Sequence, residues 1–133
     1  MKPVWIIDDD RSIRWVFEKA LAREDITYRS FGAANEAMAA LDSGEVPQVV
    51  VSDIRMPGQS GLDLLRHIKA HYPDVPTVIM TAYSDLESAV AAFQGGAFEY
   101  LPKPFDLKEL TSVVTRALAS PGGKREAVEA AEE

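Results

Sequence analysis

The 133-residue sequence has no cysteine, no long apolar run and fewer basic than acidic residues. The absence of cysteine excludes a disulfide framework and any thiolate metal site. No apolar stretch reaches the roughly 18 residues that a membrane-spanning helix needs. A formal net charge of −7, from 14 basic and 21 acidic residues, leaves no basic stripe to neutralise nucleic-acid phosphates. We therefore expect a cytoplasmic protein that contacts neither a membrane nor nucleic acid directly.

Short apolar runs rich in β-branched residues alternate along the chain with segments of helical period. The expected strands are Val4–Asp8, Ile26–Phe31, Val49–Asp53, Thr77–Thr81 and Phe98–Leu101. This alternation is typical of an α/β domain with a parallel sheet. Five such units favour a doubly wound sheet, either flavodoxin-like or half of a Rossmann fold. Aspartates occupy the turn after the first strand, where glycines would cradle a pyrophosphate, and this argues against a dinucleotide site.

The expected helices carry apolar stripes, which we expect to face the core. The first stripe is Ile13, Val16, Phe17, Ala20 and Leu21, the fourth is Leu86, Ala89, Val90 and Phe93, and the last is Leu107, Leu110, Val114, Ala117 and Leu118. Ser60, Ser84 and Asp106 are expected N-caps. Because Pro121-Gly122-Gly123 breaks the last helix, we expect one domain over residues 1–120 and a linker over residues 121–133.

Polar side chains collect where the expected strands end. Asp8, Asp9 and Asp10 follow the first strand, Asp53 ends the third, Thr81 ends the fourth, and Lys103 follows the fifth. Ligands of open α/β sheets bind at this edge. For Asp10, capping of the following helix is an equally good explanation. Asp53 ends a run of three valines and Ser52, so we expect it to be partly buried, where an unpaired carboxylate is costly. A structural alternative for Asp53 is therefore an ion pair with Arg55 or Lys103.

Carboxylates crowded at one edge repel one another, by roughly 4 kcal/mol per pair at about 4 Å and an effective dielectric near 20. A bound cation relieves this repulsion, and oxygen ligands without histidine or cysteine favour a hard ion such as Mg²⁺. The Asp53 carboxylate is then a candidate nucleophile for phosphoryl transfer. The Lys103 ammonium and the Thr81 hydroxyl could each donate to a phosphoryl oxygen.

Over residues 4–119 the sequence resembles the receiver domains of two-component response regulators. The resemblance is carried by Asp8-Asp9, by Ser52-Asp53-Ile54-Arg55-Met56-Pro57-Gly58 with Gly61 beyond, by Thr81-Ala82 and by Lys103-Pro104. It implies a flavodoxin-like (CheY-like) fold with five parallel strands in the order 2-1-3-4-5 and five helices. It also implies that Asp53 is the phosphoacceptor. The implied Mg²⁺ ligands are Asp9, Asp53 and the backbone carbonyl of Arg55, with Asp8 acting mainly through water.

The same resemblance implies a conformational switch. Thr81 is expected to move toward the phosphorylated Asp53, and Tyr100 to turn inward. Lys103 is expected to contact the phosphate, and its bond to Pro104 to be cis, as is common in the family. We expect the helix over Ser84–Gln94 to respond, because it follows Thr81 directly and has few large apolar residues to anchor it.

Arg55 and Tyr83 lie two residues beyond Asp53 and Thr81, so we expect both to border the path of an attacking water. The hypothesis is that their bulk sets the lifetime of the phosphoryl group.

A closer resemblance is to the NtrC subgroup of nitrogen regulators. It is carried by the residues from Asp8 to Val16, by the segment around Asp53, by Met80–Leu86 and by Gly95–Phe105. It implies a sensor histidine kinase as phosphoryl donor and a role in controlling sigma-54-dependent transcription. It further implies a central AAA+ ATPase domain as a partner in the parent protein, beyond the linker, and possible homodimerisation on phosphorylation. No enzymatic activity is expected beyond self-phosphotransfer and autodephosphorylation.

Two alternatives remain open. A haloacid-dehalogenase-like phosphatase also uses an aspartate nucleophile and Mg²⁺, but it places a second aspartate two residues later, where this sequence has Arg55. A pseudo-receiver that only docks partners would not need the full set of Asp9, Asp53, Thr81 and Lys103. The phosphorylatable receiver is therefore the preferred hypothesis.

Overall fold

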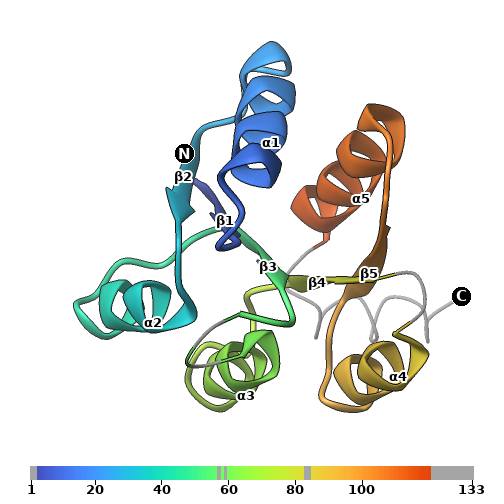
Figure 1. Cartoon of the computed structure of the whole chain (residues 1–133). Coiled ribbons are helices and arrows are strands. Elements are labelled where there is room, and N and C mark those ends of the chain that lie inside the picture. The colour runs from blue at the N-terminus through green and yellow to red at the C-terminus, as the bar shows by residue number, and fades with distance from the viewer. Residues whose placement is uncertain (1–2, 57, 59, 83–84, 121–133) are drawn as a thin grey trace, which may run out of the picture.

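The computed structural model of the chain describes residues 3–56, 58, 60–82 and 85–120. Strands and helices alternate throughout this part of the chain (Figure 1). In chain order they are β1 (Val4–Ile7), α1 (Arg11–Arg23), β2 (Tyr28–Phe31), α2 (Ala34–Asp42), β3 (Val49–Asp53), α3 (Gly61–His71), β4 (Thr77–Ala82), α4 (Leu86–Gln94), β5 (Glu99–Lys103) and α5 (Leu107–Ala119). The expected linker over residues 121–133 lies outside the described residues.

The five strands form one parallel sheet in the order β2-β1-β3-β4-β5. The flavodoxin-like topology is thereby confirmed, and the Rossmann half is excluded. The expected β3 is correct to the residue, whereas β1 ends one residue earlier, at Ile7, and β2 begins at Tyr28. The expected fifth strand was placed too early, because β5 pairs with β4 as far as Lys103. Lys103 is therefore held by the sheet and does not merely follow it.

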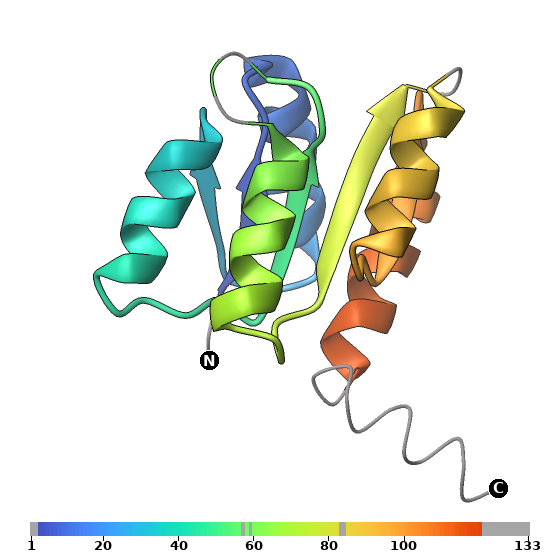
Figure 2. The same cartoon turned by 90° about the horizontal axis from the view of Figure 1, so that it is seen from below.

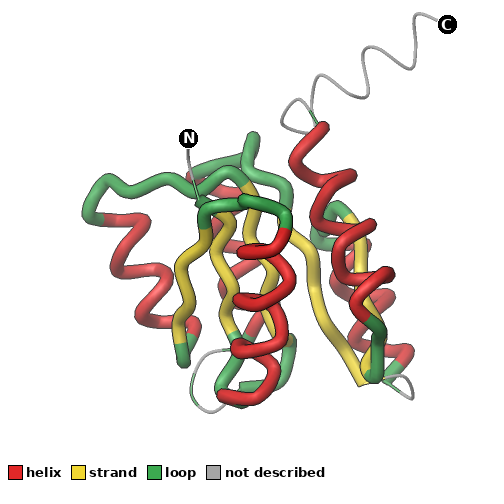
Figure 3. Tube along the Cα trace, turned by 90° about the horizontal axis from the view of Figure 1, so that it is seen from above, coloured by secondary structure: helices red, strands yellow, loops and turns green. Residues whose placement is uncertain are grey.

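Helices cover both faces of the sheet. Viewed from below, α2, α3 and α4 lie in front of the strands (Figure 2), and viewed from above, α1 lies over the strands with α5 beside it (Figure 3). The central strand β3 is buried on both faces: Val49 and Val51 pack in the core under α1 and α5, while Val50 packs in the core under α2 and α3. The uninterrupted apolar run of β3 is thereby explained, since both faces of the sheet exclude water.

Three helix N-termini are capped as their sequences predict. Ser60 and Asp106 each form a capping box, with Asp63 and Glu109 respectively. Asp10 caps α1 by accepting from the Ser12 amide. The expected cap Ser84 lies outside the described residues, and the N-cap of α4 is the next residue, Asp85. Each cap satisfies backbone donors that a helix start leaves without a partner.

Two of the expected apolar stripes are partly wrong. Val90 and Phe93 are each 47% exposed, and Leu107 is 46% exposed. The buried side chains of α4 among those described are Ala89 and Ala92, so these small residues face the sheet, while Val90 and Phe93 face outward. Helical spacing identifies which residues share a stripe, but it does not determine which stripe packs inward.

No helix in the described ranges combines the length and the apolar character needed to cross a bilayer.

Candidate functional site

Three carboxylates meet at the carboxyl end of the sheet, beside the point where the strand order reverses. Asp8 and Asp9 directly follow β1, and Asp53 is the last residue of the neighbouring strand β3. One oxygen of each lies within 4.8 Å of the others. Asp8 is 0% and Asp53 8% exposed, whereas Asp9 is open to solvent. Such a reversal point is where doubly wound folds place their ligands, as the sequence predicts.

The β1–α1 loop is fixed by hydrogen bonds around Asp8. Asp8 Oδ1 accepts from the Asp10 amide at 2.8 Å, and the Asp8 carbonyl accepts from Arg14 Nη1 at 2.6 Å. The Asp10 carboxylate is turned away to accept from the Ser12 amide at 2.8 Å. The helix-capping interpretation of Asp10 is therefore correct. The contribution of Arg14 was not predicted, because nothing in the sequence pairs it with a backbone carbonyl six residues earlier.

Lys103 joins the two buried carboxylates from across the sheet. Its Nζ lies 3.1 Å from Asp8 Oδ2 and 3.2 Å from Asp53 Oδ1. The Lys103–Pro104 peptide bond is cis, as the resemblance implies. Strand β4 separates β5 from β3, so the lysine side chain reaches past the end of β4. The ion pair of Lys103 with Asp53, which the sequence offered as a structural alternative, is thus present together with a second ion pair, to Asp8.

The carboxylates carry more negative charge than Lys103 offsets. Burial, followed by the negative charge of Asp8, raises the pKa of Asp53 from 3.8 to about 6, although Lys103 acts in the opposite direction. Burial likewise raises the pKa of Asp8, against a hydrogen bond from the Asp10 amide and the charge of Lys103. Burial alone would lower the pKa of Lys103, but the charges of Asp8 and Asp53 outweigh it and the pKa is raised. An additional cation would relieve this imbalance.

The residues present fit a hard divalent cation. Asp8, Asp9 and Asp53 offer only oxygen ligands, and one of the three is open to solvent. Mg²⁺ takes oxygen ligands, keeps several waters and is usually held by one or two protein carboxylates. Softer metals favour imidazole or thiolate ligands, which this cluster lacks.

Gly61 gives the site a close backbone contact. Its amide donates to the Ile54 carbonyl at 2.9 Å, so the start of α3 lies against the end of β3. A Cβ at position 61 would lie 2.3 Å from the Asp53 carbonyl oxygen and 2.8 Å from the Ile54 Cα. Only glycine fits there, and this reason for Gly61 is visible in the structure and not in the sequence.

The other predicted residues lie around this cluster. Thr81 is buried in β4, one residue before its end at Ala82 and one residue beyond the partner of Asp53 in the β3–β4 register. Tyr100 is half-buried, and its ring packs edge-on against Phe93 with centroids 5.3 Å apart. The Arg55 side chain donates to Asp85 at 2.8 Å, so it is directed toward α4. Tyr83 lies outside the described residues.

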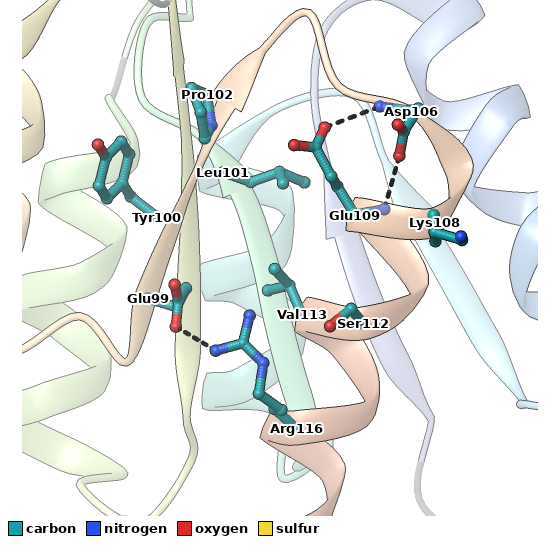
Figure 4. A pocket seen from close by; sticks show the side chains of 10 residues that line it. All are labelled: Glu99, Tyr100, Leu101, Pro102, Asp106, Lys108, Glu109, Ser112, Val113 and Arg116. Carbon is teal, nitrogen blue, oxygen red and sulfur yellow. Dashed lines mark hydrogen bonds and ion pairs between the residues drawn. The ribbon is translucent and has the colours of Figure 1, made fainter.

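A hollow lies on the surface between β5 and α5 (Figure 4). Four of the charged side chains that line it already have hydrogen-bond partners. Arg116 bonds Glu99 at 2.9 Å, and Asp106 and Glu109 form the capping box of α5. Among the described residues, the carboxylates close enough to share a metal ion are those of Asp8, Asp9 and Asp53, so the chemistry is assigned to the edge of the sheet and not to this hollow.

The comparisons with known proteins agree with this geometry. A family model described as "Response regulator receiver domain" matches residues 4–115. The chain is 55% identical over 116 residues to the DNA-binding transcriptional regulator NtrC of Salmonella typhimurium, covering 87% of this chain and 24% of that protein. It thus spans about a quarter of the length of the curated relatives it matches.

Two solution structures of the receiver domain of nitrogen regulatory protein C are each 54% identical to the chain. The match to the apo form has a TM-score of 0.79 and covers 89% of this chain and 94% of the solved chain. The match to the BeF3-activated form has a TM-score of 0.75 and covers 90% of this chain and 97% of the solved chain.

Proposed function

Because the chain belongs to the response regulator receiver domain family, we propose that Asp53 accepts a phosphoryl group from a sensor histidine kinase. The observation that carries the proposal is the buried Asp53 carboxylate, which lies beside two further carboxylates and 3.2 Å from Lys103. A carboxylate held among like charges in a buried setting is a candidate functional group. Family membership also favours a signalling role over that of a phosphatase, which would turn over outside substrates.

In the proposed transfer, Asp53 is the nucleophile, and Lys103 and Thr81 bind the phosphoryl group. An oxygen of the ionised Asp53 attacks the phosphorus of the kinase phosphohistidine. A phosphorus–oxygen bond forms as the phosphorus–nitrogen bond breaks, and the departing imidazole takes up a proton from solvent. Lys103 then pairs with a phosphoryl oxygen, and the Thr81 hydroxyl donates to another.

We propose Mg²⁺ as the cofactor, with Asp9, Asp53 and the backbone carbonyl of Arg55 as ligands and Asp8 acting through water. The bound ion would supply the positive charge that lets a phosphoryl anion approach three carboxylates. Asp8 and Asp53 are partly neutralised by Lys103, while Asp9 is open to solvent. This difference in surroundings supports Asp9 as the direct ligand among the two residues after β1.

The switch and the phosphoryl lifetime are part of the proposal. Thr81 moves toward phosphorylated Asp53 and vacates space into which Tyr100 turns. The present edge-on contact of Tyr100 with Phe93, at 5.3 Å, would then be lost, so the outer surface of α4 would change. Arg55 and Tyr83 would limit the access of water to the phosphoryl group.

We propose that the parent protein is an NtrC-type regulator of nitrogen metabolism that controls sigma-54-dependent transcription in the cytoplasm. The support is the 55% identity to an NtrC protein of which this chain covers 24%. In this proposal residues 1–120 are the receiver domain, and residues 121–133 lead to an AAA+ ATPase domain. Phosphorylation would act on that domain and could promote a homodimer.

The test of phosphoacceptance is intact-mass measurement after incubation with a small phosphodonor and Mg²⁺. The wild-type chain should gain one phosphoryl group, and Asp53→Asn should gain none, because an amide oxygen does not form the acyl phosphate. Asp63→Asn serves as a matched control, since Asp63 is a partly exposed aspartate at the start of α3. Equal labelling of wild type and Asp53→Asn would refute the proposal.

Removal of the Asp9 carboxylate should weaken Mg²⁺ binding by at least about tenfold. The reason is that a direct anionic ligand of a hard cation is lost. Calorimetric titration of Asp9→Asn with MgCl₂ measures this, and Asp10→Asn is the matched control, because Asp10 faces the Ser12 amide and not the cluster. Unchanged affinity in Asp9→Asn would remove Asp9 from the ligand set.

A further inference from the structure

The described side chains of helix α4 bury little apolar surface against the sheet. Its buried side chains among those described are Ala89 and Ala92, while Val90 and Phe93 are each 47% exposed. By contrast, α3 buries three large aliphatic side chains. Because the stabilisation from burial scales with the apolar area removed from water, contacts other than burial carry more weight in positioning α4.

One such contact reaches α4 from the loop that follows Asp53. Arg55 Nε donates to Asp85 Oδ2 at 2.8 Å, and Arg55 Nη2 donates to Ser88 Oγ at 3.4 Å. Asp85 is the N-cap of α4, and its other oxygen accepts from the Ser88 amide at 3.3 Å. A single carboxylate therefore both caps the helix and receives the guanidinium. The pairing lowers the pKa of Asp85 and raises that of Arg55, so both groups are charged.

We propose that the Arg55–Asp85 ion pair is a strut that ties the first turn of α4 to the loop after β3. The strut joins groups that are 30 positions apart in the sequence and on different elements. Through it, a shift of the Arg55 backbone reaches α4 without passing through Thr81. This transmission of a backbone shift rests on the proposed function, in which the carbonyl of the same Arg55 is a ligand of Mg²⁺.

The strut contacts the first turn of α4, and a different contact holds the other end of the helix. Phe93, near the other end of α4, packs against Tyr100 of β5 with ring centroids 5.3 Å apart. The helix is thus attached at its start to the β3–α3 loop and near its end to β5. The planar guanidinium makes two donations in a fixed fork, so it transmits a displacement better than a flexible ammonium would. Release of the strut should loosen the first turn of α4 and leave the Phe93 contact in place.

Amide hydrogen exchange on the metal-free, unphosphorylated chain tests the strut. We expect Arg55→Gln and Asp85→Asn each to speed exchange in α4 by roughly two- to fivefold, the range for an exposed ion pair. Asparagine still caps a helix, so Asp85→Asn removes the ion pair and keeps the cap. The double variant should exchange no faster than the faster single variant, because both changes break one interaction.

The matched control is Arg66→Gln, which breaks the exposed Arg66–Asp63 ion pair on α3 and should leave α4 unchanged. Unchanged α4 exchange in Arg55→Gln, or additive effects in the double variant, would overturn the strut.

A second arm follows Mg²⁺ by calorimetry and by exchange in parallel. Asp85→Asn should bind Mg²⁺ with an affinity within twofold of wild type, but the change in α4 exchange on adding Mg²⁺ should be lost. An undiminished Mg²⁺ response in Asp85→Asn would show that the coupling takes another route, and the proposal would be wrong. If the wild-type chain itself does not bind Mg²⁺, the proposed metal site fails, and the metal-free comparison alone decides whether the strut exists.

Discussion

Replacing Asp53 with asparagine should raise the free energy of unfolding of the metal-free protein at neutral pH, even though it removes the proposed phosphoacceptor. Burial and the charge of Asp8 raise the pKa of Asp53 from 3.8 to about 6. In an acid, a raised pKa means that the folded state disfavours the charged form. The cost of ionisation corresponds to about 3 kcal/mol above pH 6 and is absent below pH 4. Asparagine has nearly the same shape and carries no charge, so it avoids this cost.

The sign of the pH dependence is fixed by the same shift. Between pH 4 and 6 the folded wild-type chain binds more protons at Asp53 than the unfolded chain, so its stability falls as the pH rises. The excess of the free energy of unfolding of Asp53→Asn over that of the wild type should therefore be small at pH 4, grow through pH 5 and 6, and level off above that. Denaturant unfolding in the presence of a chelator measures it. Addition of Mg²⁺ should stabilise the wild type more than the variant and reduce the difference between their free energies of unfolding.

The control for this prediction is Asp63→Asn, which should have the opposite sign. The pKa of Asp63 is lowered by hydrogen bonds from the Ser60 amide and from Arg66, so its charged form is favoured in the folded state. Because the Asp63 side chain is 40% exposed, solvent screening makes the loss slight. A wild-type chain more stable than Asp53→Asn at pH 7.5 without metal would show that Lys103 fully compensates the buried carboxylate.

Replacing Gly61 with alanine should destabilise the fold by about 2–3 kcal/mol, the upper part of the range for overpacking a tight site. The added Cβ would lie 2.3 Å from the Asp53 carbonyl oxygen, which belongs to the rigid backbone of a central strand. Neither side can yield without moving the end of β3 or the start of α3. The displaced segment also carries the Asp53 carboxylate, so Mg²⁺ affinity should fall together with stability.

Gly32→Ala is the matched control for this substitution. A Cβ at position 32 would meet only the Arg14 side chain, at 3.5 Å, which is an ordinary contact distance. Its free energy of unfolding should change by less than about 1 kcal/mol. Denaturant unfolding and calorimetric Mg²⁺ titration of the two variants provide the comparison. Wild-type stability in Gly61→Ala would mean that the β3–α3 junction relaxes more easily than the contact distance indicates.

Much of the candidate site could be predicted because the strands are parallel. In a parallel sheet every strand ends at the same edge, so residues that end strands in the sequence become neighbours in space. This argument brings Asp8, Asp9, Asp53 and Thr81 together without any knowledge of the coordinates. The apolar run before Asp53 also predicts its burial, which the 8% exposure confirms.

The tertiary structure decided what periodicity leaves open. Helical spacing grouped Val90 and Phe93 with Ala89, but the alanine side packs on the sheet and the larger residues face outward. For Asp10, the sequence left helix capping and a place in the carboxylate cluster as equal explanations, and the structure shows that its carboxylate caps α1. In both cases the sequence defines a set of adjacent residues, and packing against another element selects among them.

The sequence by itself determined the fold class, the strand order through the family resemblance, and the edge of the sheet at which the polar residues gather. Long-range side-chain partners were decided only by the tertiary structure. Lys103 bridges Asp8 as well as Asp53, and Arg55 reaches Asp85 on another element. Long charged side chains can reach several partners, and which one they meet depends on distances between elements that are remote in the sequence. Local patterns of residues carry no record of those distances.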